Sequence, residues 1–382
     1  MKNVLLIYAT YFGILFVTLA LWGCNPNEDN PSDEPEEKGE WPIEKNVFVA
    51  GIEDMQARLW KNGTIVNLAS GIGFTASTAT VIRSEAHSVF VSGSDVYVAG
   101  SEIIMNEDGS NSRARLWKNG EIQPLSKETG SEDEAFSVFV SGNDVYVLGR
   151  ESLQPRPFRD RWAYKYWKNG ESVIFAQGSD GWNVHSIFVS DDNVYISGSV
   201  PKATGYNITL PQAKLWKNGV EENLDDIDSE TFDSQASSVF VSGNDVYVAG
   251  YIRDYPEQVY VATLWKNGKR TNLANANNVR AHSVFVSGND VYVAGESARR
   301  PILWKNGIVQ DLVDVQESSA FNSVFVSDND VFTAGHIQVI DYDTGTLPMA
   351  YLKAMLWKNN EKLILNTAEK NKASVAVSVF VE

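Results

Sequence analysis

The chain has 382 residues, a formal net charge of −17 and 43% apolar residues. Its acidity argues against a nucleic-acid partner, because phosphate binding requires a basic surface. One cysteine and four histidines leave little material for thiol or metal chemistry, and we expect neither a cofactor nor a metal.

Residues 1–24 have the composition of an export signal. Lys2 supplies a positive start, and an apolar run from Val4 to Trp22 leads to Cys24. The segment resembles a bacterial lipoprotein signal, which implies that Cys24 carries acyl chains such as palmitate and becomes the first residue of the mature protein. Trp22 departs from the small residue usual in such signals. Cys24 is the only cysteine of the chain, which favours lipidation over the alternative, a plain N-terminal membrane anchor.

Residues 25–45 predict an acidic, disordered tether. They hold eight acidic residues and two lysines, interrupted by proline, and cannot bury enough apolar area to fold. An acidic run behind a lipidated cysteine resembles the signal by which some Gram-negative bacteria export lipoproteins to the outer surface. That resemblance implies a place in the cell envelope, at the outer membrane and exposed to the outside; the alternative is a solvated spacer with no addressing role.

The rest of the chain, residues 46–382, repeats one block seven times. Each copy reads Ser-Val-Phe-Val, a polar turn, Asp-Val-Tyr-Val-Ala-Gly, a variable stretch and Leu-Trp-Lys-Asn-Gly, with small changes. The copies start 40 to 55 residues apart, which is typical of β-propellers. The starts are Ser88, Ser137, Ser186, Ser238, Ser283, Ser323 and Ser378.

Each copy predicts one blade of four antiparallel strands. The β-branched and aromatic runs have strand length, and Asn-Gly favours a two-residue hairpin turn because both residues tolerate positive φ. The last Ser-Val-Phe-Val ends the chain, whereas the first Val-Phe-Val-Ala-Gly has no such strand before it. We therefore predict an all-β, seven-bladed β-propeller, closed where strand 378–381 joins the N-terminal strands in 46–68.

The block resembles the bacterial propeller repeats of the NHL or SBBP kind over residues 46–382, in a Leu-Trp-Lys-Asn-Gly version typical of uncharacterised surface lipoproteins. It lacks their full signatures. The resemblance implies the fold and leaves the activity open, because propellers serve both binding and catalysis.

The variable stretches indicate which face recognises a ligand. Between the second and third strands, 5 to 18 residues intervene, and a face that varies on a constant scaffold is where recognition normally lies. We expect these stretches to form loops that carry five aromatic ligand-binding candidates. They are Trp162, Trp182, Tyr206, Tyr255 and Tyr342.

Three histidines occupy one repeat position, immediately before the first strand motif. They are His87, His185 and His282. We expect them to surround the mouth of the central channel as further ligand-binding candidates. A shared metal site is the alternative, but alternate blades should hold these histidines too far apart for common ligation.

No catalytic motif is present: the chain has no Gly-x-Ser-x-Gly, His-Glu-x-x-His or phosphate-binding loop. The sequence predicts a monomeric, non-catalytic binding platform, lipid-anchored to the cell envelope, that takes a protein or glycan partner on its variable face. One alternative is a glycan-binding lectin. Another is a glycoside hydrolase or lyase, which would need converging carboxylates at the channel mouth.

Overall fold

The computed structural model divides the chain into two compact units, Met1–Glu37 and Lys38–Glu382. All residues that the structure describes belong to the second unit, and they form strands and turns without a helix that could span a membrane. The described residues are 45–70, 80–106, 109–125, 132–154, 161–179, 181–203, 209–224, 232–254, 259–273, 278–310, 319–341, 349–359, 361–365 and 372–382.

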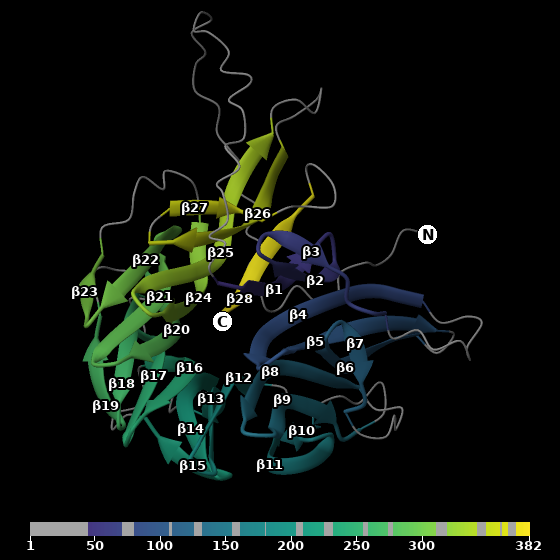
Figure 1. The fold of residues 1–382 in the computed structure, drawn as a ribbon. Coiled ribbons are helices and arrows are strands. Elements are labelled where there is room, and N and C mark those ends of the chain that lie inside the picture. The colour runs from purple at the N-terminus through teal and green to yellow at the C-terminus, as the bar shows by residue number, and fades with distance from the viewer. Residues whose placement is uncertain are drawn as a thin grey trace, which may run out of the picture. The chain divides into compact units, whose positions relative to one another are not determined.

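Seven four-stranded antiparallel sheets are arranged around a common centre, as the sequence predicts (Figure 1). We call them blades A to G and list their strands from the centre to the rim. Blade A consists of β28 (Ser374–Val381), β1 (Val47–Glu53), β2 (Gln56–Lys61) and β3 (Thr64–Val66); blade B of β4 (Thr80–Ser92), β5 (Asp95–Asn106), β6 (Gly109–Lys118) and β7 (Glu121–Gln123). Blade C consists of β8 (Asp133–Ser141), β9 (Asp144–Ser152), β10 (Arg161–Lys168) and β11 (Glu171–Ser179); blade D of β12 (Asn183–Ser190), β13 (Asn193–Ala203), β14 (Thr209–Lys217) and β15 (Val220–Asn223). Blade E consists of β16 (Phe232–Ser242), β17 (Asp245–Asp254), β18 (Val259–Lys266) and β19 (Lys269–Asn272); blade F of β20 (Val279–Ser287), β21 (Asp290–Ser297), β22 (Arg300–Lys305) and β23 (Ile308–Val309); blade G of β24 (Ser319–Ser327), β25 (Asp330–Asp341), β26 (Met349–Lys358) and β27 (Glu361–Ile364).

The repeated Leu-Trp-Lys-Asn-Gly motif serves the blade and its tight turn. The asparagine adopts a φ of 48° to 53° in all seven copies, as the two-residue turn requires. Its side-chain oxygen accepts a hydrogen bond of 2.8–2.9 Å from the backbone N–H of a valine in the first two residues of the second strand. The lysine lies over an aromatic ring of the second strand at 5.1–5.9 Å. The tryptophan is at most 3% exposed in every copy, so its ring packs inside the protein.

The split copy closes the ring. β28 pairs with β1 in antiparallel register, for example Val379 with Val49, although the two strands lie at opposite ends of the chain. Asn46 and Glu382 exchange backbone hydrogen bonds of 3.0 and 2.9 Å beyond the last pair. The predicted closure is thus confirmed, and blade A depends on the last nine residues.

A closed ring of phenylalanines occupies the centre. Each phenylalanine of the Ser-Val-Phe motif contacts those of the two neighbouring blades, with centroids 4.5–4.9 Å apart. If the seven centroids form a regular heptagon with this spacing, each lies about 5 Å from its centre. The phenylalanine side chains therefore narrow the central channel at this level. The members are Phe90, Phe139, Phe188, Phe240, Phe285, Phe325 and Phe380.

The serine of the same motif connects the blades. In every blade its hydroxyl accepts a hydrogen bond of 3.1–3.4 Å from a backbone N–H of the next innermost strand. Val138, for instance, donates to Ser88, and Val89 donates to Ser378, which completes the circle. These bonds satisfy donors on the inner edge of each blade, where no further strand is available.

The variable stretches differ from the prediction, because much of their length is in strand. In blade B the residues from Ser101 to Asn106 continue β5 and pair with the start of β6. In blade G, β25 and β26 extend their pairing in the same way as far as Asp341 and Met349. Differences between copies are therefore expressed largely as longer hairpins, because added residues can continue the hydrogen-bonded ladder.

Deleting residues 374–382 should destabilise the whole ring, because it removes β28 from blade A. Val379 and Val381 are each 4% exposed, and losing them with their contacts should cost about 5 kcal/mol or more. Denaturant unfolding measures this loss. The substitution Glu382→Ala is the control and should change stability by less than about 0.5 kcal/mol, since its side chain is exposed. A truncated chain that unfolds cooperatively at the same midpoint would contradict the closure.

Candidate functional site

Every innermost strand carries a β-bulge at the same repeat position. In blade B, Ala86 pairs with Gly100 and Ser88 with Ala99, so that His87 between them has no cross-strand partner. Such bulges redirect side chains and are frequent beside functional sites. The seven bulged residues are His87, Phe136, His185, Ser237, His282, Asn322 and Val377. They define what we call the bulge face, the face of the ring opposite the tight turns.

The bulge explains the glycine of the Val-Ala-Gly motif. A Cβ on Gly250 would lie 1.9 Å from the carbonyl oxygen of Gln235, two residues before the bulge. The corresponding distance in the other six blades is 1.9–2.1 Å. Only glycine allows the two backbones to approach this closely.

Bulged residues join neighbouring blades. His87 Nδ1 lies 2.8 Å from the carbonyl oxygen of Ala135 in blade C. The Asn322 amide donates to the carbonyl oxygen of Ala376 in blade A, at 2.8 Å. The two residues thus make equivalent contacts, each to the residue before the next bulge.

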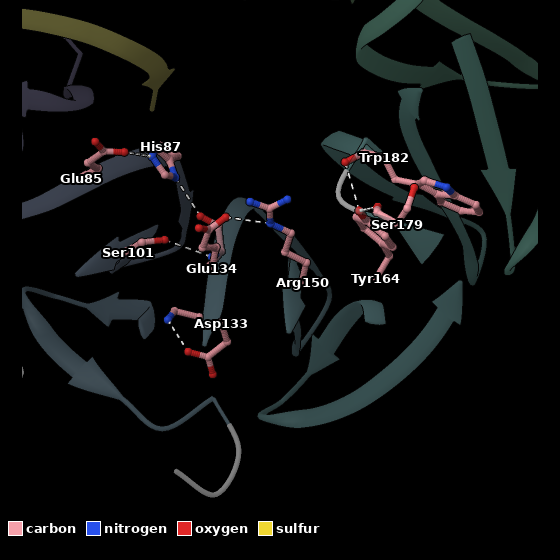
Figure 2. Close-up of polar contacts among 11 residues, drawn as sticks. Glu85, His87, Ser101, Asp133, Glu134, Arg150, Tyr164, Ser179 and Trp182 are labelled. Atoms are coloured by element: carbon pink, nitrogen blue, oxygen red, sulfur yellow. Dashed lines mark hydrogen bonds and ion pairs between the residues drawn. The ribbon is translucent and has the colours of Figure 1, made fainter. Parts of the chain in front are cut away.

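A first polar cluster lies on blades B and C (Figure 2). His87 Nε2 is 2.9 Å from Glu85, and Arg83 forms an ion pair with the same carboxylate. Burial alone would raise the pKa of Glu85, but the hydrogen bond and charge of His87, together with Arg83, hold it below its usual value. Burial opposes the charge on His87, yet Glu85 raises the pKa of His87 above 6.5. The two side chains therefore favour the charged pair.

Arg150 extends this cluster into blade C. Its Nε donates to Glu134 at 2.8 Å, and its guanidinium lies 4.1 Å from the ring centroid of Trp162. Trp162 is 4% exposed and belongs to β10, so its predicted place in a loop is wrong. The longer β10–β11 hairpin incorporates it into the sheet, where Arg150 covers its face.

Trp182 does lie in a connection, between β11 and β12, but it packs inward. Its ring stacks on Tyr164 at 5.5 Å and on Trp216 at 6.3 Å. Its backbone carbonyl also accepts a hydrogen bond from the Tyr164 hydroxyl (Figure 2). Both tryptophan candidates thus use their aromatic faces within the protein.

A second polar network begins in blade D and continues through blade E. The Tyr251 hydroxyl donates to Gln235 Oε1 at 2.5 Å, and the Gln235 amide lies 2.5 Å from His185 Nε2. An amide that donates to this nitrogen requires neutral imidazole. Burial, assisted by the charge of His282, lowers the pKa of His185 to about 4. The hydrogen-bond chain and the lowered pKa therefore agree.

The network continues into blades E and F through two arginines. Arg280 lies 3.9 Å from the ring centroid of Tyr260 and donates to Glu296 at 3.1 Å. Arg253 donates to the Tyr260 hydroxyl at 2.9 Å and forms an ion pair with Asp233. Burial raises the pKa of Asp233 despite that arginine. Two cations and two carboxylates thus balance one another around one tyrosine.

The remaining histidines lie at the edge of this network. His282 Nε2 is 4.0 Å from Glu296, too far for a hydrogen bond. Burial lowers the pKa of His282, and it also lowers that of His336, for which the charges of Glu296 and His282 are secondary. His185, His282 and His336 thus belong to one electrostatic group, whereas His87 pairs separately with Glu85. Among the described side chains, no three acids, histidines or cysteines are arranged to hold a metal ion.

Four candidates lie outside the described residues: Cys24, Tyr206, Tyr255 and Tyr342. Conversely, sequence reasoning did not single out several polar residues of the bulge face. Arg150, Tyr251 and Glu296 each directly follow the invariant glycine, and Gln235 and Arg280 each precede the bulge by two residues. Their fixed offsets from the repeat were the available signal, but only the bulge shows that these offsets meet at one face.

Comparison with known proteins gives no family assignment: no family model and no curated protein matches the chain. Among solved structures, the Pyrococcus horikoshii acylaminoacyl peptidase aligns at 12% identity over 74% of this chain and 52% of that one, with a TM-score of 0.44. The chain thus spans about half the length of that peptidase.

Two further solved structures cover more of their own length. The β-propeller domain of the Trilobed protease from Pyrococcus furiosus is 9% identical over 75% of this chain and 97% of that one, with a TM-score of 0.39. The GH32 β-fructofuranosidase from Bombyx mori is 11% identical, with 84% and 73% covered and a TM-score of 0.30. At such low sequence identities and TM-scores, these similarities say nothing about the activity, substrate or partners of this chain. The lipoprotein signal and the NHL or SBBP type of the repeat remain predictions.

Replacing Gly250 with alanine should destabilise the ring by about 3 kcal/mol, because the new methyl group would overlap the Gln235 carbonyl. Gly243→Ala in the same blade is the matched control. Its backbone has a φ of 56° and open space around it, so only the left-handed conformation should cost about 1 kcal/mol. Denaturant unfolding of both variants tests the difference, and equal losses would contradict the bulge geometry.

Stability should fall in acid partly through His185. Because its folded pKa of about 4 lies below 6.5, the unfolded chain binds this proton more readily. Its contribution is complete above the unfolded pKa and is lost as the pH falls towards the folded pKa. His185→Asn, which introduces the residue that blade G carries at this position (Asn322), should reduce the loss between about pH 7 and about pH 4.5 by about 2 kcal/mol. Identical pH profiles of unfolding free energy would refute this assignment.

Proposed function

We propose that the protein is a non-catalytic binding protein of the bacterial cell envelope, anchored by lipid at Cys24, that takes its partner on the bulge face. One observation carries the proposal. All seven blades use the same bulge, held by the same glycine, but the displaced residue ranges from His87 through Phe136 and Ser237 to Val377. A constant frame with a varied set of side chains is suited to recognition.

The state of the acidic groups supports binding over hydrolysis. A glycoside hydrolase or lyase at this face would need carboxylates free to donate or accept a proton. Glu85, Glu134 and Glu296 instead form ion pairs with arginines of the same or the adjoining strand. Burial raises the pKa of Asp233, but its carboxylate forms an ion pair with Arg253. These contacts fix the carboxylates as parts of the surface.

A protein partner is favoured over a glycan. Glycan recognition would use exposed aromatic faces, yet Trp162 lies beneath Arg150 and Trp182 stacks on two other rings. The glycan alternative therefore depends on Tyr206, Tyr255 and Tyr342. In blades C, E and F, three described arginine–carboxylate pairs each combine one positive and one negative charge, in contrast to the net charge of −17 of the whole chain. Such pairs add no net charge, so they can face an acidic or a basic partner without strong repulsion.

Site-specific photocrosslinking in the cells that make the protein tests the proposal. Benzoylphenylalanine at Ser237 places the probe on the bulge face, where the equivalent position of blade C already carries an aromatic residue, Phe136. The same probe at Ser94 samples the tight-turn face, because Ser94 is exposed there. Full-length protein with the probe at Ser237 should form a discrete protein adduct, and the probe at Ser94 should give much less of it. A discrete adduct from Ser94 alone, or from neither position, would overturn the proposal.

A further inference from the structure

The outermost strand of blade C differs from those of all other blades. β3, β7, β15, β19, β23 and β27 have two to four residues each, whereas β11 has nine. It lies at the rim of the ring (Figure 1). Short edge strands are one device by which proteins avoid pairing with other chains. Blade C lacks this protection.

The sequence allows β11 to continue, although it does not by itself require the longer strand. The fourth residue after Asn-Gly is asparagine, proline or aspartate in five copies; these are Asn67, Pro124, Asn223, Asn272 and Asp311. Such residues are disfavoured in strands and end the short ones. Blade C has Ile174 at this position, and blade G has Ile364, at which the four-residue strand β27 ends. In blade C the strand passes through a bulge at Phe175 and pairs with β10 as far as Ser179.

β11 is held firmly, yet much of it faces solvent. Phe175 packs on Trp216 of blade D, with centroids 5.6 Å apart, and β10 covers the inner edge along the whole strand. Val173 and Ile174 nevertheless remain 41% and 50% exposed. Glu171 is the only charged residue of the strand, and it contains neither lysine nor proline. By contrast, β19 begins with Lys269 and Arg270.

The hairpin register shows which backbone groups are free. Lys168 pairs with Glu171 across the two-residue turn, so these residues exchange hydrogen bonds and alternate residues face outwards. The outermost hairpins of blades E and F show the same alternation. There the backbone N–H groups of Leu273 and Gln310, an even number of residues after the first residue of the outermost strand, donate inwards to the third strand at 2.9 and 2.8 Å. Ser172 and Ile174 therefore direct their N–H and C=O groups towards the rim. This row of donors and acceptors matches an added strand.

We propose that β11 pairs with β11 of a second copy of this chain, in antiparallel orientation around a twofold axis. This arrangement joins two blades into one eight-stranded sheet. It places the exposed Val173–Ile174 segments opposite each other and the two Glu171 side chains at opposite ends, so no like charges face across the junction. The tether of the same chain is a poorer occupant, because residues 25–45 combine four prolines with eight acids. The proposal is independent of the partner on the bulge face, and it replaces the expected monomer with a dimer.

Disulfide trapping in membranes that contain the full chain tests this pairing. The substitution Ile174→Cys places a thiol near the twofold axis, and Val309→Cys is the matched control, because Val309 is also 50% exposed on an outermost strand. After mild oxidation, Ile174→Cys should give a covalent dimer in non-reducing gels. The control should give about tenfold less. Equal amounts from both variants, or no dimer from Ile174→Cys, would overturn the proposal.

A second substitution distinguishes strand pairing from chance collision. Ser172→Pro, added to Ile174→Cys, removes one outward donor and leaves the ladder to β10 intact. It should reduce the trapped dimer about tenfold. The control is Arg270→Pro, at the same position of blade E, likewise added to Ile174→Cys. It should leave the amount of trapped dimer unchanged. Thermal unfolding of both proline variants confirms that the ring is folded. Trapping that persists in the folded Ser172→Pro variant would show that the contact is not a shared sheet.

Discussion

The structure depends on the hydrogen bond that each blade makes to the next at the centre. The innermost strand of a propeller blade has an inner edge with no strand to pair with. In this chain the serine of every Ser-Val-Phe motif accepts an N–H from the following blade, and the seventh such bond runs from Val89 to Ser378. The adjacent phenylalanines form a second closed circle. Both circles require the C-terminal strand, which makes closure a condition for all seven blades.

The same innermost strands create the candidate site. Each one bulges on the side opposite the tight turns, and the carbonyl group before the bulge approaches the second strand so closely that only glycine fits. The frame is therefore invariant, while the displaced and flanking side chains vary. Two different environments result: the Glu85–His87 pair favours charge, whereas His185 is held neutral by burial. A repetitive scaffold thus presents a surface without sevenfold symmetry.

At the rim, by contrast, the strand itself differs between blades. Six outermost strands are too short to pair with another chain, and the exception is β11. A β-branched residue, Ile174, replaces the polar residue or proline found in five other copies, but Ile364 of the short β27 shows that this replacement alone does not lengthen the strand. The two departures from the repeat serve different contacts: side chains vary on the bulge face, whereas backbone is exposed at the rim. The proposed partner binding and the proposed self-association therefore involve different residues and can be tested separately by mutation.

The sequence by itself determined the fold. Each copy of the repeat contains recognisable strand segments, and its Asn-Gly turn requires positive φ. The split copy is completed by joining the first and last repeated segments. It also placed three histidines at one repeat position. What it could not determine was how residues far apart in the chain meet. Trp162 lies in a sheet because the hairpin of blade C extends, and Gln235 reaches His185 because neighbouring blades converge at the bulges. Only the tertiary structure decided these contacts, since they depend on strand register and on the angle between blades, which a one-dimensional repeat does not encode.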